Sequence, residues 1–129
     1  MVFTKAELAF LRKQPIGRLC TVGPGGKPQV RPVNVHLGSD DATIEIFGPI
    51  LAQTQKWRNI IHNPQVSFIV DHVIPQPRNI QGIEIRGTAT TLPRERPPAD
   101  GFSGDIIRIT PRRIVAWGID EGGTHARDV

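Results

Sequence analysis

The stretch Thr54–Asp71, TQKWRNIIHNPQVSFIVD, changes its hydrophobic period in the middle. In its first half, apolar side chains recur three and four positions apart: Trp57, Ile60 and Ile61. That spacing predicts a short helix with one buried face, and Asn63-Pro64 ends it because a residue before proline disfavours the helical conformation. In the second half, apolar residues alternate with polar ones: Val66, Phe68 and Val70. This alternation predicts a strand.

Strand-like alternation recurs on both sides of this stretch. Before it, strands are predicted over three segments: Ile16–Val22, Gln29–Leu37 and Thr43–Phe47. The first two are joined by the turn residues Gly23-Pro24-Gly25-Gly26, so they form a hairpin, which the third segment extends to a three-strand meander. After it come a strand over Ile80–Thr91 and two short final strands on either side of Pro111-Arg112-Arg113, at Ile107–Ile109 and Val115–Trp117.

A second helix and a long loop complete the predicted elements. Thr4-Lys5-Ala6-Glu7 is typical of a capping box and opens a short helix that ends before Pro15. Leu92–Gly104 is rich in proline, glycine and charge, which predicts a loop. Six or seven short strands at this spacing favour a mainly β fold, a small closed or nearly closed β-barrel flanked by two helices. The length suits one domain over residues 1–129.

Charge and composition narrow the class of function. The formal net charge is +4 with scattered basic residues, which favours an anionic partner, while the absence of Tyr speaks against base stacking and nucleic-acid binding. Cys20 is the single cysteine, so no disulfide can form within the chain and a reducing, cytoplasmic location is expected. No apolar run approaches membrane-spanning length and no signal-peptide pattern is visible, so no membrane partner is expected.

Several familiar motifs are missing or lie in the wrong context. The segment Gly23–Pro28, GPGGKP, differs from a phosphate-binding loop because Lys27 is followed by proline and a strand, not by Ser or Thr at the start of a helix. The histidines do not pair at metal-ligand spacing: His36, His62, His72 and His125. No GxSxG or other nucleophile motif is present. No metal ligand or catalytic side chain is therefore assigned.

The start of the predicted second helix holds the best candidate for ligand contact. Lys56 and Arg58 lie there, after the break at Gly48-Pro49. Free amide groups and the helix dipole attract anions at such a position, Thr54 adds a hydroxyl, and a nearby Arg31 would complete a phosphate site. The same residues also fit an ordinary solvated helix face. From the residues alone, both interpretations stay open.

Several blocks carry a resemblance to a known family by their order and spacing: ELAFLRKQPIGRLCTVGPGGKPQVRPV, TQKWRNIIHNPQVSFIVD, GIEIRGTAT, IIRITPRRIVAWGID and the terminal ARDV. The chain resembles the flavin-type split barrels of the pyridoxamine 5′-phosphate oxidase-like superfamily. Within it, the chain is most similar to the actinobacterial branch of F420-dependent oxidoreductases. The resemblance covers nearly the whole chain. It implies a six- to seven-stranded split barrel and a homodimer with cofactor sites at the subunit interface.

The resemblance also implies a set of cofactor-binding residues. In the superfamily, an Arg in the second strand and a Ser/Thr-Arg-Lys at the helix start hold the cofactor phosphate, which corresponds here to Arg31 and to Thr54-Gln55-Lys56. Backbone of the second and third strands would line the ring system: Val33, Asn34, Ile46 and Phe47. The region of Trp117 would approach from the partner subunit.

Two departures from the family pattern lie at the same place. Gln55 stands where relatives carry the middle basic residue, and Gly48–Leu51, GPIL, stands where they tend to carry Gly-His-Asn-Leu. Losing a guanidinium from a phosphate clamp is expected to weaken binding by about 1.5–3 kcal/mol, the contribution of a charged hydrogen bond.

The resemblance implies hydride transfer between coenzyme F420 and a small conjugated organic substrate. The cofactor would supply the chemistry and the protein its position and electrostatics, so few reactive side chains would be needed. The first alternative is an FMN-dependent oxidoreductase of the same fold. The second is a non-catalytic module that sequesters a cofactor, haem or small ligand, and the departures at Gln55 and Pro49-Ile50 favour it.

Overall fold

The computed structural model describes residues 1–93, 101, 103–120 and 123–129. Its helices are α1 (Lys5–Lys13) and α2 (Gln55–His62), with short 3-10 turns η1 (Pro24–Gly26) and η2 (Leu51–Gln53). Its strands are β1 (Ile16–Val22), β2 (Pro28–Asn34), β3 (His36–Leu37), β4 (Ile44–Ile46), β5 (Gln65–Pro75), β6 (Arg78–Leu92), β7 (Ile106–Trp117) and β8 (Thr124–Asp128). The mainly β prediction with two helices is confirmed.

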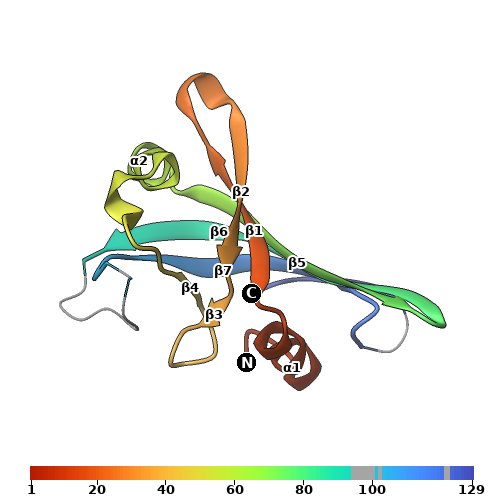
Figure 1. The fold of residues 1–129 in the computed structure, drawn as a ribbon. Helices are drawn as coiled ribbons and strands as arrows, with labels where there is room; N and C mark the ends of the chain where they lie inside the picture. Colours follow the sequence, from red (N-terminus) through yellow and green to blue (C-terminus); the bar gives the residue numbers. More distant parts are fainter. Residues whose placement is uncertain (94–100, 102, 121–122) are drawn as a thin grey trace.

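All eight described strands belong to one curled sheet. Their order is β2-β1-β5-β6-β7-β4-β3, and β8 adds to β7. β2 and β3 are thus at opposite ends of the order, although only Val35 separates them in the chain. The chain therefore runs from one end of the sheet to the other, which gives the split-barrel form that the resemblance implied (Figure 1).

This split corrects one detail of the predicted meander. The segment Gln29–Leu37 is not one strand, because it breaks at Val35, whose backbone N–H donates to the Pro15 carbonyl at 3.2 Å. The part before the break pairs with β1, and the part after it pairs with β4. The sequence pattern did not reveal the break because Val33, Val35 and Leu37 all face the core on both sides of it.

The C-terminal region differs from the prediction in two ways. Instead of two short strands around Pro111, β7 runs unbroken from Ile106 to Trp117. A register shift between Arg86 and Gly87 accommodates the proline opposite Gly87, because a bulge tolerates the missing N–H donor. A side chain at Gly87 would clash with the Thr110 carbonyl. β8 was not predicted, since its sequence has no apolar alternation; it pairs with β7 along the backbone, and Arg113 of β7 also donates to Asp128 of β8.

The helices begin and end where the sequence indicates. α1 starts at a complete capping box, in which the Thr4 hydroxyl accepts from the Glu7 amide at 3.1 Å and Glu7 accepts from the Thr4 amide at 2.9 Å. α2 starts at Thr54, whose hydroxyl accepts from the Trp57 amide. The inner face of α2 packs against the core through the buried side chain of Ile60. In Figure 1, α2 lies above the long strands β6 and β7 and α1 below them, and α2 stands beside the β1–β2 hairpin.

The core fills the inside of the curl. Its fully enclosed side chains are mostly aliphatic: Phe3, Phe68, Leu11, Leu19, Ile44, Ile46, Leu51, Ile83, Ile85, Ile106, Ile107 and Ile109. In the described part of the chain, no helix has the length and apolar character needed to cross a membrane. Of the predicted loop Leu92–Gly104, residues 94–100 and 102 lie outside the described residues. Ser103 is described, and both its amide and its hydroxyl donate to the Gly48 carbonyl.

Candidate functional site

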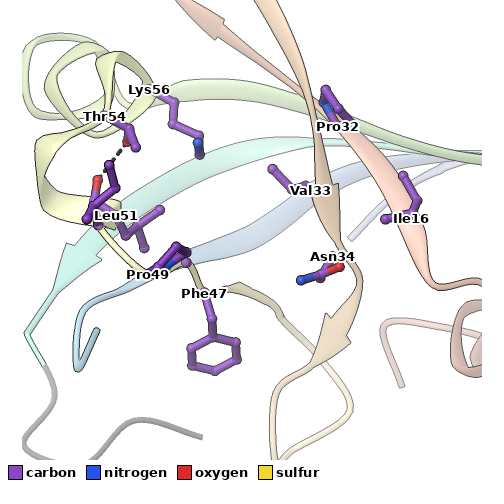
Figure 2. A pocket seen from close by; sticks show the side chains of 11 residues that line it. Ile16, Pro32, Val33, Asn34, Phe47, Pro49, Leu51, Thr54 and Lys56 are labelled. Carbon is purple, nitrogen blue, oxygen red and sulfur yellow. Dashed lines mark hydrogen bonds between the residues drawn. The ribbon is translucent and has the colours of Figure 1, made fainter. Parts of the chain in front are cut away.

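The approach to α2 is built around the Thr54 hydroxyl. It donates to the Leu51 carbonyl at 2.6 Å and accepts from the Trp57 amide at 3.4 Å, so one side chain joins the end of η2 to the first turn of α2. The isobutyl group of Leu51 is buried in the core and anchors this corner. Lys56 is the second residue of α2 after this corner, and its side chain points toward β2 (Figure 2).

Lys56 and Arg31 form a pair of like charges across the gap between α2 and β2. The pKa of Lys56 is lowered, first by burial of its ammonium and second by repulsion from the Arg31 guanidinium. Arg31 is exposed and donates only to the neighbouring Val30 carbonyl, at 3.0 Å. Among the described residues neither cation has an ion-pair partner. Two uncompensated cations at a capped helix start favour an anion there.

A cavity of about 300 Å³ opens beside Lys56. The cavity is lined mostly by apolar residues, together with a few polar ones. The lining residues are Ile16, Pro32, Val33, Asn34, Phe47, Gly48, Pro49, Ile50, Leu51, Thr54 and Lys56. Figure 2 shows Lys56 and Thr54 on one side of this cavity and Phe47 with Asn34 on the other. An apolar slot with a cation at one end suits a flat, mainly apolar ring that carries an anionic substituent.

A second cavity of about 430 Å³ adjoins the first and contains Arg31 and Gln55. The two cavities have four lining residues in common: Pro32, Ile50, Thr54 and Lys56. Lys56 therefore lines both cavities and lies at their junction. A ligand with a ring in the first cavity and a charged tail in the second would pass directly over it.

Gln55 is held by its neighbours on α2. Its amide nitrogen donates to the Asn59 side-chain oxygen at 2.7 Å, and its oxygen accepts from Arg58 at 2.9 Å. Arg58 also donates to the Gln53 carbonyl at 3.0 Å. The Arg58 guanidinium is therefore occupied by hydrogen bonds within the start of α2. It does not compensate for the missing basic residue at position 55.

Asn59 is a structural partner that sequence reasoning missed. It is buried, and its side-chain nitrogen donates to the Thr21 hydroxyl at 2.9 Å and to the Gln29 side-chain oxygen at 3.0 Å. One amide thus ties α2 to both strands of the β1–β2 hairpin. The signal was a single polar residue beside Ile60 on a helix with a buried face.

Most of the predicted cofactor-binding residues gather around the two cavities. The first cavity contains Val33, Asn34, Phe47, Thr54 and Lys56, and the second contains Arg31, Thr54, Gln55 and Lys56. Two predicted residues do not line either cavity. The Ile46 side chain is fully buried in the core, and Trp117 lies at the end of β7 against Gly82.

His36 was not singled out by the sequence and lies near this site. Its ring packs edge-on against Phe47, with centroids 5.1 Å apart and an interplanar angle of 77°. Burial lowers the pKa of His36, and the Glu45 carboxylate on the paired strand partly opposes this. The described part of the chain contains no group of three or more metal-ligating side chains.

Comparisons with known proteins identify similar sequences and similar folds. Residues 3–122 match the family model described as pyridoxamine 5′-phosphate oxidase. The 5a,11a-dehydrotetracycline/5a,11a-dehydrooxytetracycline reductase of Streptomyces rimosus subsp. rimosus is 43% identical over 136 residues, which cover 100% of this chain and 94% of the relative. A solved structure of an F420 reductase aligns with a TM-score of 0.63 at 25% identity, over 82% of this chain and 93% of that one. A FAD-binding protein from Mesorhizobium loti aligns with a TM-score of 0.66 at 20% identity, over 88% and 94%, and this likeness concerns the fold alone.

Proposed function

Since this chain belongs to the pyridoxamine 5′-phosphate oxidase family and is an oxidoreductase, we propose that it is an F420-dependent reductase of a small conjugated organic substrate. The uncompensated pair of Lys56 and Arg31 carries the proposal, because coenzyme F420 has a phosphate that two adjacent cations would bind. The relative from Streptomyces rimosus is named as a reductase of 5a,11a-dehydrotetracycline and 5a,11a-dehydrooxytetracycline, and the aligned solved structure is that of an F420 reductase.

The residues of the two cavities fit such a cofactor. Lys56 and Arg31 would hold the phosphate, and the Thr54 hydroxyl, which already caps α2, would keep the first turn in place beneath it. The apolar walls from Val33 and Phe47 would sandwich the ring and exclude water from its face. When bound, the deazaflavin supplies the hydride; the side chains described here bind and orient.

We further propose that the protein acts as a homodimer whose second copy closes the site. Large apolar side chains at and near the cavity rim are exposed: Ile16 at 40%, Val30 at 54% and Ile50 at 57%. Exposed apolar side chains gathered in one region favour association with another protein surface. Trp117, which does not line either cavity of its own chain, would reach the site of the partner subunit.

A binding measurement tests the function directly. The protein is purified from a host that makes FMN but no deazaflavin, and coenzyme F420 is then titrated while its fluorescence is followed. The proposal predicts a colourless preparation that binds F420 and loses about ten- to a hundredfold in affinity in Lys56→Ala, through the loss of a charged hydrogen bond. Lys27→Ala, at an exposed turn, is the matched control and should bind normally. Unchanged F420 binding in Lys56→Ala would contradict the phosphate site.

FMN is the alternative cofactor, because it also combines a tricyclic ring with a phosphate. A yellow preparation with a flavin spectrum and no affinity for F420 would assign the protein to FMN. Gln55 favours a third outcome, a non-catalytic binding module, because its amide is engaged by Asn59 and Arg58 and adds no charge to the clamp. Indifference to both cofactors at micromolar concentration would support that outcome.

A further inference from the structure

A third cavity, of about 520 Å³, lies between α2 and the turn η1 that joins β1 to β2. One of its walls is a single face of α2, formed by residues that recur three and four positions apart: Gln55, Arg58, Asn59 and His62. The glycine turn forms the facing wall. The third cavity is larger than either of the first two, and Gln55 is its only lining residue in common with them.

The charge in the third cavity comes from Arg58. Arg58 is exposed, and no acidic side chain lines the cavity. Its Nη1 donates to the Gln53 carbonyl and its Nη2 to the Gln55 side chain, which leaves Nε–H and one further N–H on each Nη for a ligand. In the part of the chain that the structure describes, Arg58 has no ion-pair partner. A guanidinium with free N–H groups in a cavity without acids suits a carboxylate.

The glycine turn leaves its own side of the cavity open. Gly25 and Gly26 have φ angles of 73° and 77°, a backbone conformation that glycine adopts without strain. A Cβ atom built on either residue would have no other atom within 4 Å. The backbone of this turn is therefore uncovered, so that a ligand chain can approach it closely.

The third cavity continues the second. Gln55 lines both cavities. Arg58, which lines the third, donates at 3.0 Å to the carbonyl of Gln53, which lines the second. The Arg58 guanidinium therefore lies at the border between them. A ligand whose phosphate is held by Lys56 and Arg31 would meet Arg58 if it extended past that phosphate toward the turn.

We propose that the third cavity binds a carboxylate-bearing chain that continues beyond the phosphate of the cofactor. The inference rests on the proposed function, which places the phosphate between Lys56 and Arg31. Coenzyme F420 carries a lactyl-oligoglutamate chain on its phosphate, whereas the phosphate of FMN is terminal. The third cavity thus favours F420 over FMN, because the glutamate carboxylates would reach Arg58 and FMN would leave this cavity empty.

Two forms of the coenzyme test the contact: F420 with several glutamates and F420 without any. Wild-type protein should bind the glutamate-bearing form more tightly. Arg58→Met should weaken that form about two- to fivefold, the range for an exposed ion pair, and spare the glutamate-free form. Arg58→Lys, which keeps the charge, should recover part of the loss. Arg78→Met, at an exposed arginine on β6, is the matched control and should change neither affinity.

Two results would overturn the inference. The first is equal affinity of the wild-type protein for both forms of the coenzyme. The second is an equal loss for both forms in Arg58→Met, which would mean that Arg58 only supports the start of α2 through Gln53 and Gln55.

The same ligands distinguish this inference from the proposed function. Lys56→Ala should weaken both forms alike, because both contain the phosphate. If Lys56→Ala spares both while Arg58→Met weakens only the glutamate-bearing form, the phosphate site fails and the contact with the chain stands. If the wild-type protein binds both forms equally, the contact with the chain fails and the proposed function stands. If it binds neither form, both fail.

A measurement on the wild-type protein keeps the inference testable even if Arg58→Met does not fold. The backbone amide resonances of Gly25 and Gly26 should shift on saturation with the glutamate-bearing form and stay in place with the glutamate-free form. Free oligo-γ-glutamate offers the same carboxylates without the ring and phosphate, so at the same concentration it should leave these resonances unchanged. Shifts with the free peptide but not with the coenzyme would overturn the link to the cofactor.

Discussion

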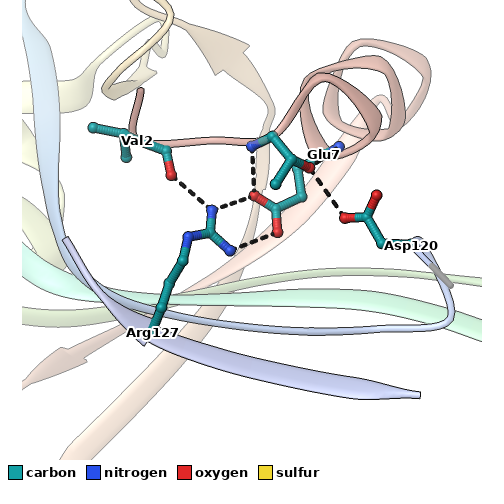
Figure 3. A network of polar contacts seen from close by, with 5 residues as sticks. Val2, Glu7, Asp120 and Arg127 are labelled. Atoms are coloured by element: carbon teal, nitrogen blue, oxygen red, sulfur yellow. Dashed lines mark hydrogen bonds and ion pairs between the residues drawn. The ribbon is translucent and has the colours of Figure 1, made fainter. Parts of the chain in front are cut away.

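The Arg127 guanidinium holds the Glu7 carboxylate through two hydrogen bonds, Nη2 to Oε1 at 2.6 Å and Nη1 to Oε2 at 3.0 Å (Figure 3). The Glu7 side chain is only 1% exposed. Arg127 also donates to the Val2 carbonyl at 2.7 Å. Because Glu7 is part of the α1 capping box and Arg127 lies on β8, this pair joins the first helix to the last strand, 120 residues apart.

Removing Arg127 should destabilise the fold strongly. Arg127→Met leaves the Glu7 carboxylate buried without its cation, and breaking a buried pair in this way costs about 3 kcal/mol in the free energy of unfolding. Urea denaturation measures it. Arg113→Met is the control, since the Asp128 side chain that Arg113 pairs with is 82% exposed, and it should cost less than about 1 kcal/mol. Equal losses in the two variants would show that burial of Glu7 does not matter.

Asn59→Ala should loosen α2 from the β1–β2 hairpin. The substitution leaves the Thr21 hydroxyl, the Gln29 side chain and the Gln55 amide without their shared partner. An expected loss of about 2–3 kcal/mol follows from unpaired groups at a buried site. The exposed Asn79, replaced by Ala, provides the control. Hydrogen exchange of the α2 amides should accelerate in Asn59→Ala, and unchanged exchange would contradict this role.

Lys56→Gln should stabilise the ligand-free protein slightly while impairing cofactor binding. The pKa of Lys56 is lowered in the fold, so its charged form is less favourable there than in the unfolded chain at neutral pH. Removing the charge relieves this cost, and about 0.5 kcal/mol or less is expected for a partly exposed group. Thermal unfolding of Lys56→Gln and of the control Lys27→Gln compares the two sites. A clear destabilisation by Lys56→Gln would mean that the ammonium has a structural role.

Stability should fall in mildly acidic solution because of His36. Its pKa in the fold lies below the ordinary value of 6.5, with burial as the main cause. As the pH falls, His36 therefore binds a proton in the unfolded chain before it does so in the folded chain. The contribution of neutral His36 to the free energy of unfolding is fully present above pH 6.5 and is lost as the pH falls toward the folded pKa. Urea denaturation at several pH values should show a smaller decrease for His36→Gln than for wild type. Identical pH profiles would contradict the burial of this ring.

The sequence pattern predicted the elements whose signals are local. The period change after Asn63 gave α2 and β5, and the capping box at Thr4 gave α1. The sequence pattern did not predict features that depend on partners distant in the chain. The continuity of β7 through Pro111 depends on a bulge at Arg112, opposite Arg86 and Gly87 of β6, and β8 depends on the free edge of β7.

The same division holds at the candidate site. Lys56, Thr54 and Arg31 were predicted, and the structure brings them together around two adjoining cavities. His36 carried no sequence signal, because a lone histidine in a strand becomes notable only when its neighbours leave Nε2 buried and unpaired. The hydrogen bonds of the Gln55 side chain to Asn59 and Arg58 could likewise not be predicted from the sequence, since they depend on the rotamers of those two residues.

The most direct test of the central claim is the pKa of the Lys56 ammonium, measured by NMR of the labelled side chain with and without saturating coenzyme F420. In the free protein the account predicts a pKa below the ordinary value of 10.5, as burial and Arg31 require. A phosphate bound between the two cations should raise it, because an adjacent negative charge favours the protonated form. A Lys56 pKa that does not change when the coenzyme is bound would contradict the account.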